Sequence, residues 1–85
     1  MGNSSNYWKN KIVSENMLVY LEDESIFKIN LPMRRRNIDI VRSVCCDNTS
    51  YYDLAAKYGI SAVRVRQIII SYATTVSRAK SKGEL

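Results

Sequence analysis

Apolar residues recur at helical spacing from residue 32 onward. In 32–46 they fall at i, i+3, i+6 and i+7, the pattern of one buried helix face: Ile38, Val41, Val44 and Cys45. Pro32 suits the first turn of such a helix, because a missing N–H needs no partner there. The turn-forming run Asp47-Asn48-Thr49 follows. The pattern therefore predicts a helix over 32–46.

Two further helices are predicted over 50–57 and 61–76. Ser50 and Asp53 have the spacing of a capping box, in which the hydroxyl accepts a backbone N–H bond and the carboxylate reaches back. Ser61 can cap the next helix in the same way. The inner face of that helix is expected to hold Val65, Ile68, Ile69, Tyr72 and Val76.

The short connection between these two helices has the features of a helix-turn-helix unit. Gly59 lies where a chain leaving a helix needs positive φ. Ala55, four residues earlier, is small enough for the second helix to cross close to it. The other positions that such a unit packs inward hold suitable residues: Leu54, Tyr58, Ile60, Val65 and Ile68. The set predicts a helix-turn-helix.

The first thirty residues are less regular. Residues 1–6 are small and polar, and we expect them to be disordered. Residues 7–30 fit either a helix or two short strands around an acidic turn, and periodicity alone leaves both open. Tyr7 and Trp8 are expected to make core or dimer contacts. This acidic, apolar zone is the candidate surface for a dimer or another partner.

Together these elements predict an all-α, mainly helical fold. It is a small helix-turn-helix domain of three to four helices, with an N-terminal segment that is a helix or a short hairpin. The helix-turn-helix domain is expected to span 31–80, with 81–85 as a tail. A chain of 85 residues accommodates one domain and leaves no room for a large catalytic cleft.

Basic residues are concentrated in the C-terminal part of the chain. The sequence has 13 Lys and Arg against 8 Asp and Glu, a net charge of +5. Up to Met33 three basic and four acidic residues sum to −1, whereas from Arg34 onward ten basic and four acidic residues sum to +6. A concentrated positive field attracts polyanions, so nucleic acid is the first candidate partner. A solvated basic face without a partner is the alternative.

The composition argues against an enzyme or a metalloprotein. The chain has no His, which removes the commonest general base and metal ligand. Its two cysteines, Cys45 and Cys46, are adjacent and too few for a zinc site. We expect two reduced thiols, at least one facing a core, which suits a cytoplasmic protein. No apolar run is long enough to span a membrane, and no metal, cofactor or catalytic residue is expected.

Three runs of the C-terminal part form a recognisable combination. They are Leu-Pro-Met-Arg-Arg-Arg at 31–36, Ser-Tyr-Tyr-Asp-Leu-Ala-Ala-Lys-Tyr-Gly-Ile-Ser at 50–61, and Arg-Val-Arg-Gln-Ile at 64–68. Together they resemble region 4 of bacterial sigma-70-type factors over about 31–80. The resemblance implies an isolated promoter-reading helix-turn-helix module from a bacterium or phage. The family commonly has two polar or charged residues after the cap of the recognition helix, where this chain has Ala62 and Val63.

The outward face of the helix over 61–76 is the expected base-reading surface. It holds Ser61, Ala62, Val63, Arg66, Gln67 and Ile70. Gln pairs with adenine, Arg with guanine, and Ala or Val contacts the thymine methyl group, so an A·T-rich site is expected. Phosphate contacts are expected from Arg34, Arg35, Arg36, Ser50, Lys57, Arg64, Arg78 and Lys80.

The sequence thus predicts a DNA-binding transcriptional regulator. The expected partners are double-stranded DNA, a second copy of the chain and RNA polymerase, with no membrane partner. The apolar residues Val63 and Ile70 on a face exposed to water leave an alternative open. In that alternative the chain is a non-enzymatic adaptor that binds RNA polymerase or a sigma factor by mimicking region 4.

Overall fold

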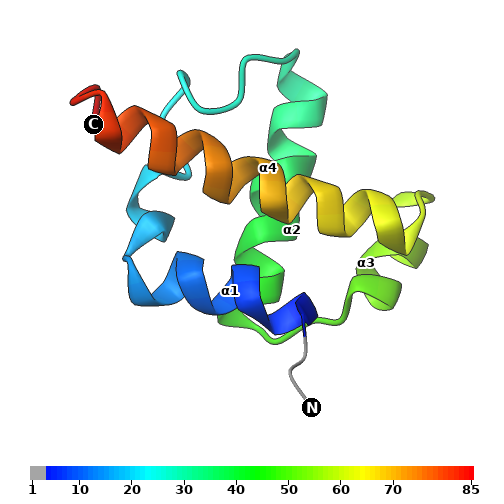
Figure 1. Cartoon of the computed structure of the whole chain (residues 1–85). Helices are drawn as coiled ribbons and strands as arrows, with labels where there is room; N and C mark the ends of the chain where they lie inside the picture. Colours follow the sequence, from blue (N-terminus) through cyan, green and yellow to red (C-terminus); the bar gives the residue numbers. More distant parts are fainter. Residues whose placement is uncertain (1–3) are drawn as a thin grey trace.

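The computed structural model describes residues 4–85, which form an all-α domain (Figure 1). In chain order its elements are α1 (Ser4–Ser14), the 3-10 helix η1 (Met17–Tyr20), α2 (Leu31–Cys46), α3 (Tyr51–Tyr58) and α4 (Ala62–Ser81). No strand occurs in residues 4–85. The all-α prediction is therefore confirmed, and each of the three predicted C-terminal helices is present.

The C-terminal helix α4 organises the core. It packs against α1, α2 and α3, and in Figure 1 it crosses in front of α2, with α1 and α3 below it. Its predicted inner face is buried: Val65, Ile68, Ile69, Tyr72 and Val76. The helix continues five residues past the predicted end at 76, because Ala79 is also buried and Gly83, with φ 74°, ends the last turn.

Helix α2 begins and ends as the sequence predicts. The Asn30 side chain accepts a hydrogen bond from the Met33 N–H (3.4 Å), and Pro32 lies in the first turn. The predicted apolar face is buried at Ile38, Val41 and Val44, and Cys45 is half-buried against the core. Ile40, which the periodicity did not include, is also fully buried, because α2 is covered on more than one side.

The N-terminal expectations need correction. Helix α1 begins at Ser4, inside the segment expected to be disordered, while residues 1–3 lie outside the described part of the chain. It ends at Ser14, and Asn16 adopts φ 55°, so the helix predicted as one alternative covers only part of 7–30. The hairpin alternative is wrong. Within α1, Ile12 is buried whereas Val13 is 50% exposed.

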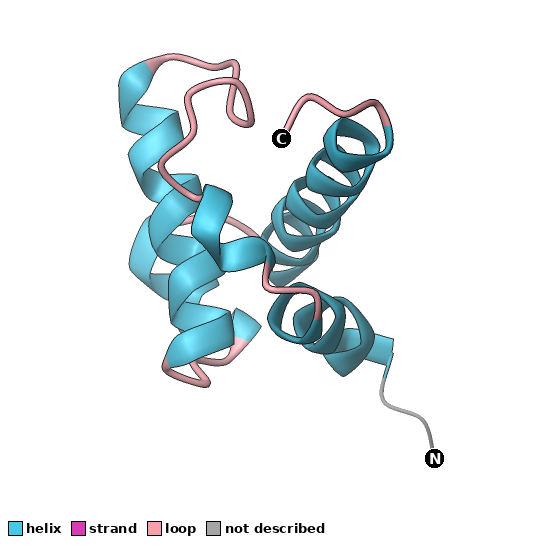
Figure 2. Ribbon diagram, turned by 90° about the vertical axis from the view of Figure 1, so that its left-hand side faces the viewer, coloured by secondary structure: helices cyan, strands magenta, loops and turns pink. Residues whose placement is uncertain are grey.

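Residues 21–30 form a loop that is anchored to the core. Figure 2 shows it leading from η1 to the start of α2. The Phe27 ring stacks on Tyr72 at 5.4 Å between centroids, and the Tyr72 hydroxyl donates a 2.6 Å hydrogen bond to the Met17 carbonyl. Trp8 also packs against the core, whereas Tyr7 is mostly exposed and touches only the Trp8 edge among aromatic rings of the described residues. Much of the N-terminal zone is thus used inside the domain.

Candidate nucleic-acid interface

Helices α3 and α4 are each capped at the N-terminus by a serine hydroxyl. The Ser50 hydroxyl accepts from the Asp53 N–H, and the Ser61 hydroxyl accepts from the Arg64 N–H, each at 3.0 Å. The reciprocal half of the predicted capping box, from the Asp53 carboxylate, is not formed within residues 4–85. Two caps nonetheless fix where each helix begins, and so fix which side chains of α4 face outward.

The turn between the two helices has the predicted geometry. Gly59 adopts φ 65°, and the Gly59 and Ile60 N–H groups both bond to the Ala55 carbonyl. Ala55 is half-buried against the core, as a close crossing requires. Leu54, Val65 and Ile68 are buried, and Tyr58 and Ile60 pack partly against the core. The inward register of the helix-turn-helix is therefore confirmed.

The expected base-reading residues divide into outer and flanking positions. On a helix of 3.6 residues per turn, Val63, Gln67 and Ile70 share the stripe opposite the buried face. Val63 is 66% exposed and Gln67 is exposed, whereas Ile70 is half-buried. Ala62 and Arg66 are half-buried on the flank. Ser61 is exposed, but its hydroxyl is already used as the helix cap.

The cations on α4 have no ion-pair partner within residues 4–85. The helix contains Arg64, Arg66, Arg78 and Lys80 and no acidic residue. In the described part of the chain none of the four forms an ion pair; the ion pairs found there use other cations, namely Lys11, Arg34, Arg42 and Lys57. The exposed surface of α4 is thus an uncharged stripe with unpaired positive charge beside it.

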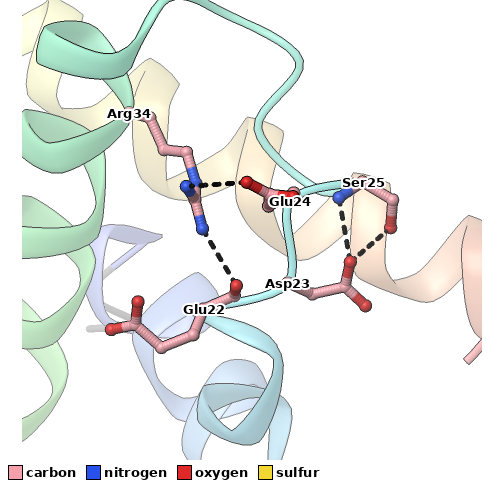
Figure 3. Close-up of polar contacts among 5 residues, drawn as sticks. All are labelled: Glu22, Asp23, Glu24, Ser25 and Arg34. Carbon is pink, nitrogen blue, oxygen red and sulfur yellow. Dashed lines mark hydrogen bonds and ion pairs between the residues drawn. The ribbon is translucent and has the colours of Figure 1, made fainter.

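The arginine triplet at the start of α2 behaves differently from the prediction. The Arg34 guanidinium contacts the Glu22 carbonyl and the Glu24 carboxylate (Figure 3). It donates a 2.9 Å hydrogen bond to the carbonyl and lies 3.7 Å from the carboxylate. The Arg34 side chain is only 16% exposed. The Arg36 Nε donates to the Asn37 side chain (3.2 Å), and Arg36 Nη2 is buried. Of the triplet, only Arg35 is exposed. The Arg34 side chain is bonded to the loop 21–30, and the half-buried Arg36 side chain exposes little surface that a phosphate could contact.

Two other expected phosphate contacts also have internal roles. Lys57 Nζ lies 2.9 Å from the Asp39 carboxylate, which also accepts a hydrogen bond from the Tyr58 hydroxyl. The Tyr58 bond, followed by Lys57, lowers the pKa of Asp39, although partial burial opposes this shift. Ser50 serves as the α3 cap. The Asp39 interactions join α2 to α3 and were missed because Asp39 lies 18 residues from Lys57.

Other chemistry in the described residues is sparse. No group of His, Cys, Asp or Glu with the arrangement of a metal site occurs there. Both cysteines are free; Cys46 is exposed, and burial raises the pKa of the Cys45 thiol to about 11, which disfavours the reactive thiolate. Among the described helices none is both long and apolar enough to cross a membrane.

Comparison with known proteins adds no family assignment. No family model, no curated protein and no solved structure matches this chain. Function is therefore inferred from the geometry of α3 and α4 and from the charges around them.

Proposed function

We propose that this chain is a sequence-specific DNA-binding transcriptional regulator that places the N-terminal half of α4 in the major groove. The observation that carries the proposal is the surface of α4. An exposed, uncharged stripe containing Val63 and Gln67 is flanked by Arg64 and Arg66, which have no ion-pair partner in residues 4–85. The major groove accommodates an α-helix, and such a surface offers base contacts with phosphate contacts beside them.

The roles of individual residues follow from this placement. Gln67 pairs with adenine through its amide, Val63 contacts a thymine methyl group, and Arg66 reaches a guanine or the backbone. Arg35, Arg64, Arg78 and Lys80 are the remaining phosphate contacts, since all four are exposed. Gln67 is the only exposed amide on the base-facing half of α4, so it carries most of the expected sequence preference. The free thiols suit the reducing cytoplasm, where such a regulator acts.

Selection of bound sequences from a random duplex pool tests the proposal. Wild-type protein is expected to enrich an A·T-rich motif, and the number of half-sites recovered tests whether a homodimer binds. Gln67→Ala is expected to relax preference at one or two base pairs, by about 1–3 kcal/mol each, with random DNA bound almost as before. Asn10→Ala removes an exposed amide from α1 and serves as the matched control.

The adaptor function is the second candidate, and the exposure of Val63 favours it. A branched apolar side chain that is 66% exposed also suits a protein partner. Under this alternative the chain has no salt-dependent affinity for random duplex DNA. Val63→Asp then abolishes capture by purified RNA polymerase or its sigma factor, while Gln67→Ala has no effect on that capture. A selected DNA motif that loses specificity in Gln67→Ala rules this alternative out.

A further inference from the structure

A cleft of about 330 Å³ lies beside the proposed base-reading stripe. We call it the α2–α4 cleft; its walls are residues 26–29, the start of α2, and one side of α4. The volume is at the lower end of the range of about 300–1,000 Å³ that small-molecule sites occupy. Its apolar lining includes Ile26, Phe27, Met33 and Ile68. The cleft therefore offers a flat apolar body a place to bind.

Among the described residues no acidic side chain lines the α2–α4 cleft. Three acidic residues, Glu22, Asp23 and Glu24, come shortly before residues 26–29, which form one wall of it. Figure 3 shows the contacts of two of those carboxylates, Asp23 and Glu24. Glu24 pairs with Arg34, and Asp23 accepts from the Ser25 N–H (2.9 Å) and hydroxyl (2.7 Å). Glu22 pairs with Arg42 at 3.1 Å. These carboxylates are thus engaged by partners that do not line the cleft, although Glu24 and Lys28 share a neighbouring hollow.

Two cations remain at the cleft without such partners. Lys28 and Arg64 line it, and neither forms an ion pair within residues 4–85. They come from different elements, the loop and α4, and so approach the cleft from two walls. Because Lys28 and Arg64 line the cleft and no carboxylate of residues 4–85 does, the field there favours an anion over a cation.

Neutral donors complete the lining. Asn37 is only 9% exposed, and its Oδ1 already accepts from Arg36, so its amide nitrogen remains available as a donor. Gln67, Ser71 and Thr75 add an amide and two hydroxyls along one side of α4. An apolar lining with a few converging polar groups is typical of small-molecule sites.

We propose that the α2–α4 cleft binds a small organic anion with an apolar body. The carboxylate or phosphate head lies between Arg64 and Lys28, and the body lies on Phe27, Met33 and Ile68. Binding in the cleft occupies Arg64 and Gln67, which also face the proposed DNA site. The ligand therefore competes with DNA; this consequence rests on the proposed function, whereas the anion site itself does not.

The site is tested on the protein alone, by following backbone amide signals in NMR titrations. The probes are 2-naphthoate, 2-naphthyl phosphate and the uncharged 2-naphthylmethanol. Both anions are expected to shift the signals of Lys28, Asn37, Gln67 and Ser71, and to bind about tenfold more tightly than the alcohol. The stronger of the two anions identifies the head group. Equal binding of the alcohol, or shifts that map elsewhere, overturns the proposal.

Three variants locate the binding on the cleft. Arg64→Gln is expected to weaken naphthoate binding about tenfold, because it removes a charge-assisted hydrogen bond. Arg78→Gln removes the same charge from an exposed position of α4 outside the cleft lining and is expected to leave binding unchanged. Ser71→Leu fills the cleft without changing charge and is expected to abolish binding, with the thermal melt confirming the fold. Unchanged binding in both Arg64→Gln and Ser71→Leu rules out the site.

A second experiment, competition between 2-naphthoate and duplex DNA, distinguishes this proposal from the DNA proposal. In wild-type protein 2-naphthoate is expected to weaken binding to the selected duplex, and in Ser71→Leu it has no such effect. Protein that binds naphthoate in the cleft but never binds duplex DNA supports the anion site and contradicts the DNA function. Protein that binds duplex DNA but not naphthoate supports the DNA function and contradicts the anion site.

Discussion

The start of α2 and the surface of α4 carry similar numbers of arginines and lysines but use them in opposite ways. At the start of α2, Arg34 bonds to the Glu22 carbonyl and pairs with Glu24, and Arg36 is half-buried. On α4, Arg64 and Arg78 are exposed and have no ion-pair partner in the described residues. A run of basic residues in the sequence therefore does not by itself show which cations are left without an internal partner.

The same comparison explains why three cations are tolerated at a helix N-terminus. Positive charge there opposes the helix macrodipole, and the sequence predicts phosphate contacts for these residues. For Arg34 the compensating groups are internal, a carbonyl and a carboxylate 12 and 10 residues earlier in the chain. Arg34 thus serves to hold the loop 21–30 against α2.

The largest expected effect tests the structural role of Arg34. Arg34→Ala leaves the Glu22 carbonyl and the Glu24 carboxylate without their partner, so the free energy of unfolding is expected to fall by about 1.5–3 kcal/mol. Urea unfolding followed by circular dichroism measures this change. Arg35→Ala, in the same turn but exposed, is the matched control, with an expected change below about 0.5 kcal/mol. Equal losses in the two variants contradict the contrast drawn within the triplet.

An intermediate effect tests the role of the α4 cations. Arg64→Gln and Arg78→Gln are each expected to leave stability unchanged and to weaken binding to all duplex sequences. The slope of log affinity against log salt is expected to flatten by about 0.9 for each phosphate that the variant no longer neutralises. Fluorescence anisotropy with a labelled random duplex at several salt concentrations provides both quantities. A salt slope that is the same in wild type and both variants removes these arginines from the interface.

The smallest expected effect concerns the internally paired Lys57. Hydrogen bonding from Tyr58 and then Lys57 lowers the pKa of Asp39 below its ordinary value of 3.8. A carboxylate whose folded-state pKa is lowered stabilises the fold above its unfolded pKa, and that stabilisation is lost as pH falls through the folded-state pKa. Asp39→Asn is therefore expected to cost about 0.2–1 kcal/mol at pH 7, as exposed pairs do, and almost nothing at pH 2.

The measurement for Asp39 is urea unfolding of wild type and variant at both pH values. Asp53→Asn is the control, because Asp53 is exposed and forms no ion pair in the described residues. A difference between Asp39→Asn and wild type that persists undiminished at pH 2 contradicts the assigned pairing. That result would return Lys57 to the set of free cations.

Much of the C-terminal fold follows from the sequence, because the signals there are local. The caps at Ser50 and Ser61 and the glycine at 59 act within one turn of themselves, and the structure places them as predicted. The inner stripe of α4 follows from 3.6-residue periodicity alone. The N-terminal part was less predictable, since Asn16 in a left-handed conformation carries no strong signal in sequence and interrupts the helical periodicity between α1 and η1.

The roles of the charged residues were decided only by the tertiary structure. Sequence established that the C-terminal part carries a net charge of +6, and it predicted the inner face of α4 that the structure buries. It did not establish that Arg34 and Lys57 pair with internal partners, or that residues 26–29 and α4 line a cleft to which no carboxylate of residues 4–85 contributes. The physical reason is range: helix periodicity and capping join neighbours along the chain, whereas a side-chain partner is set by which distant segments the core brings together.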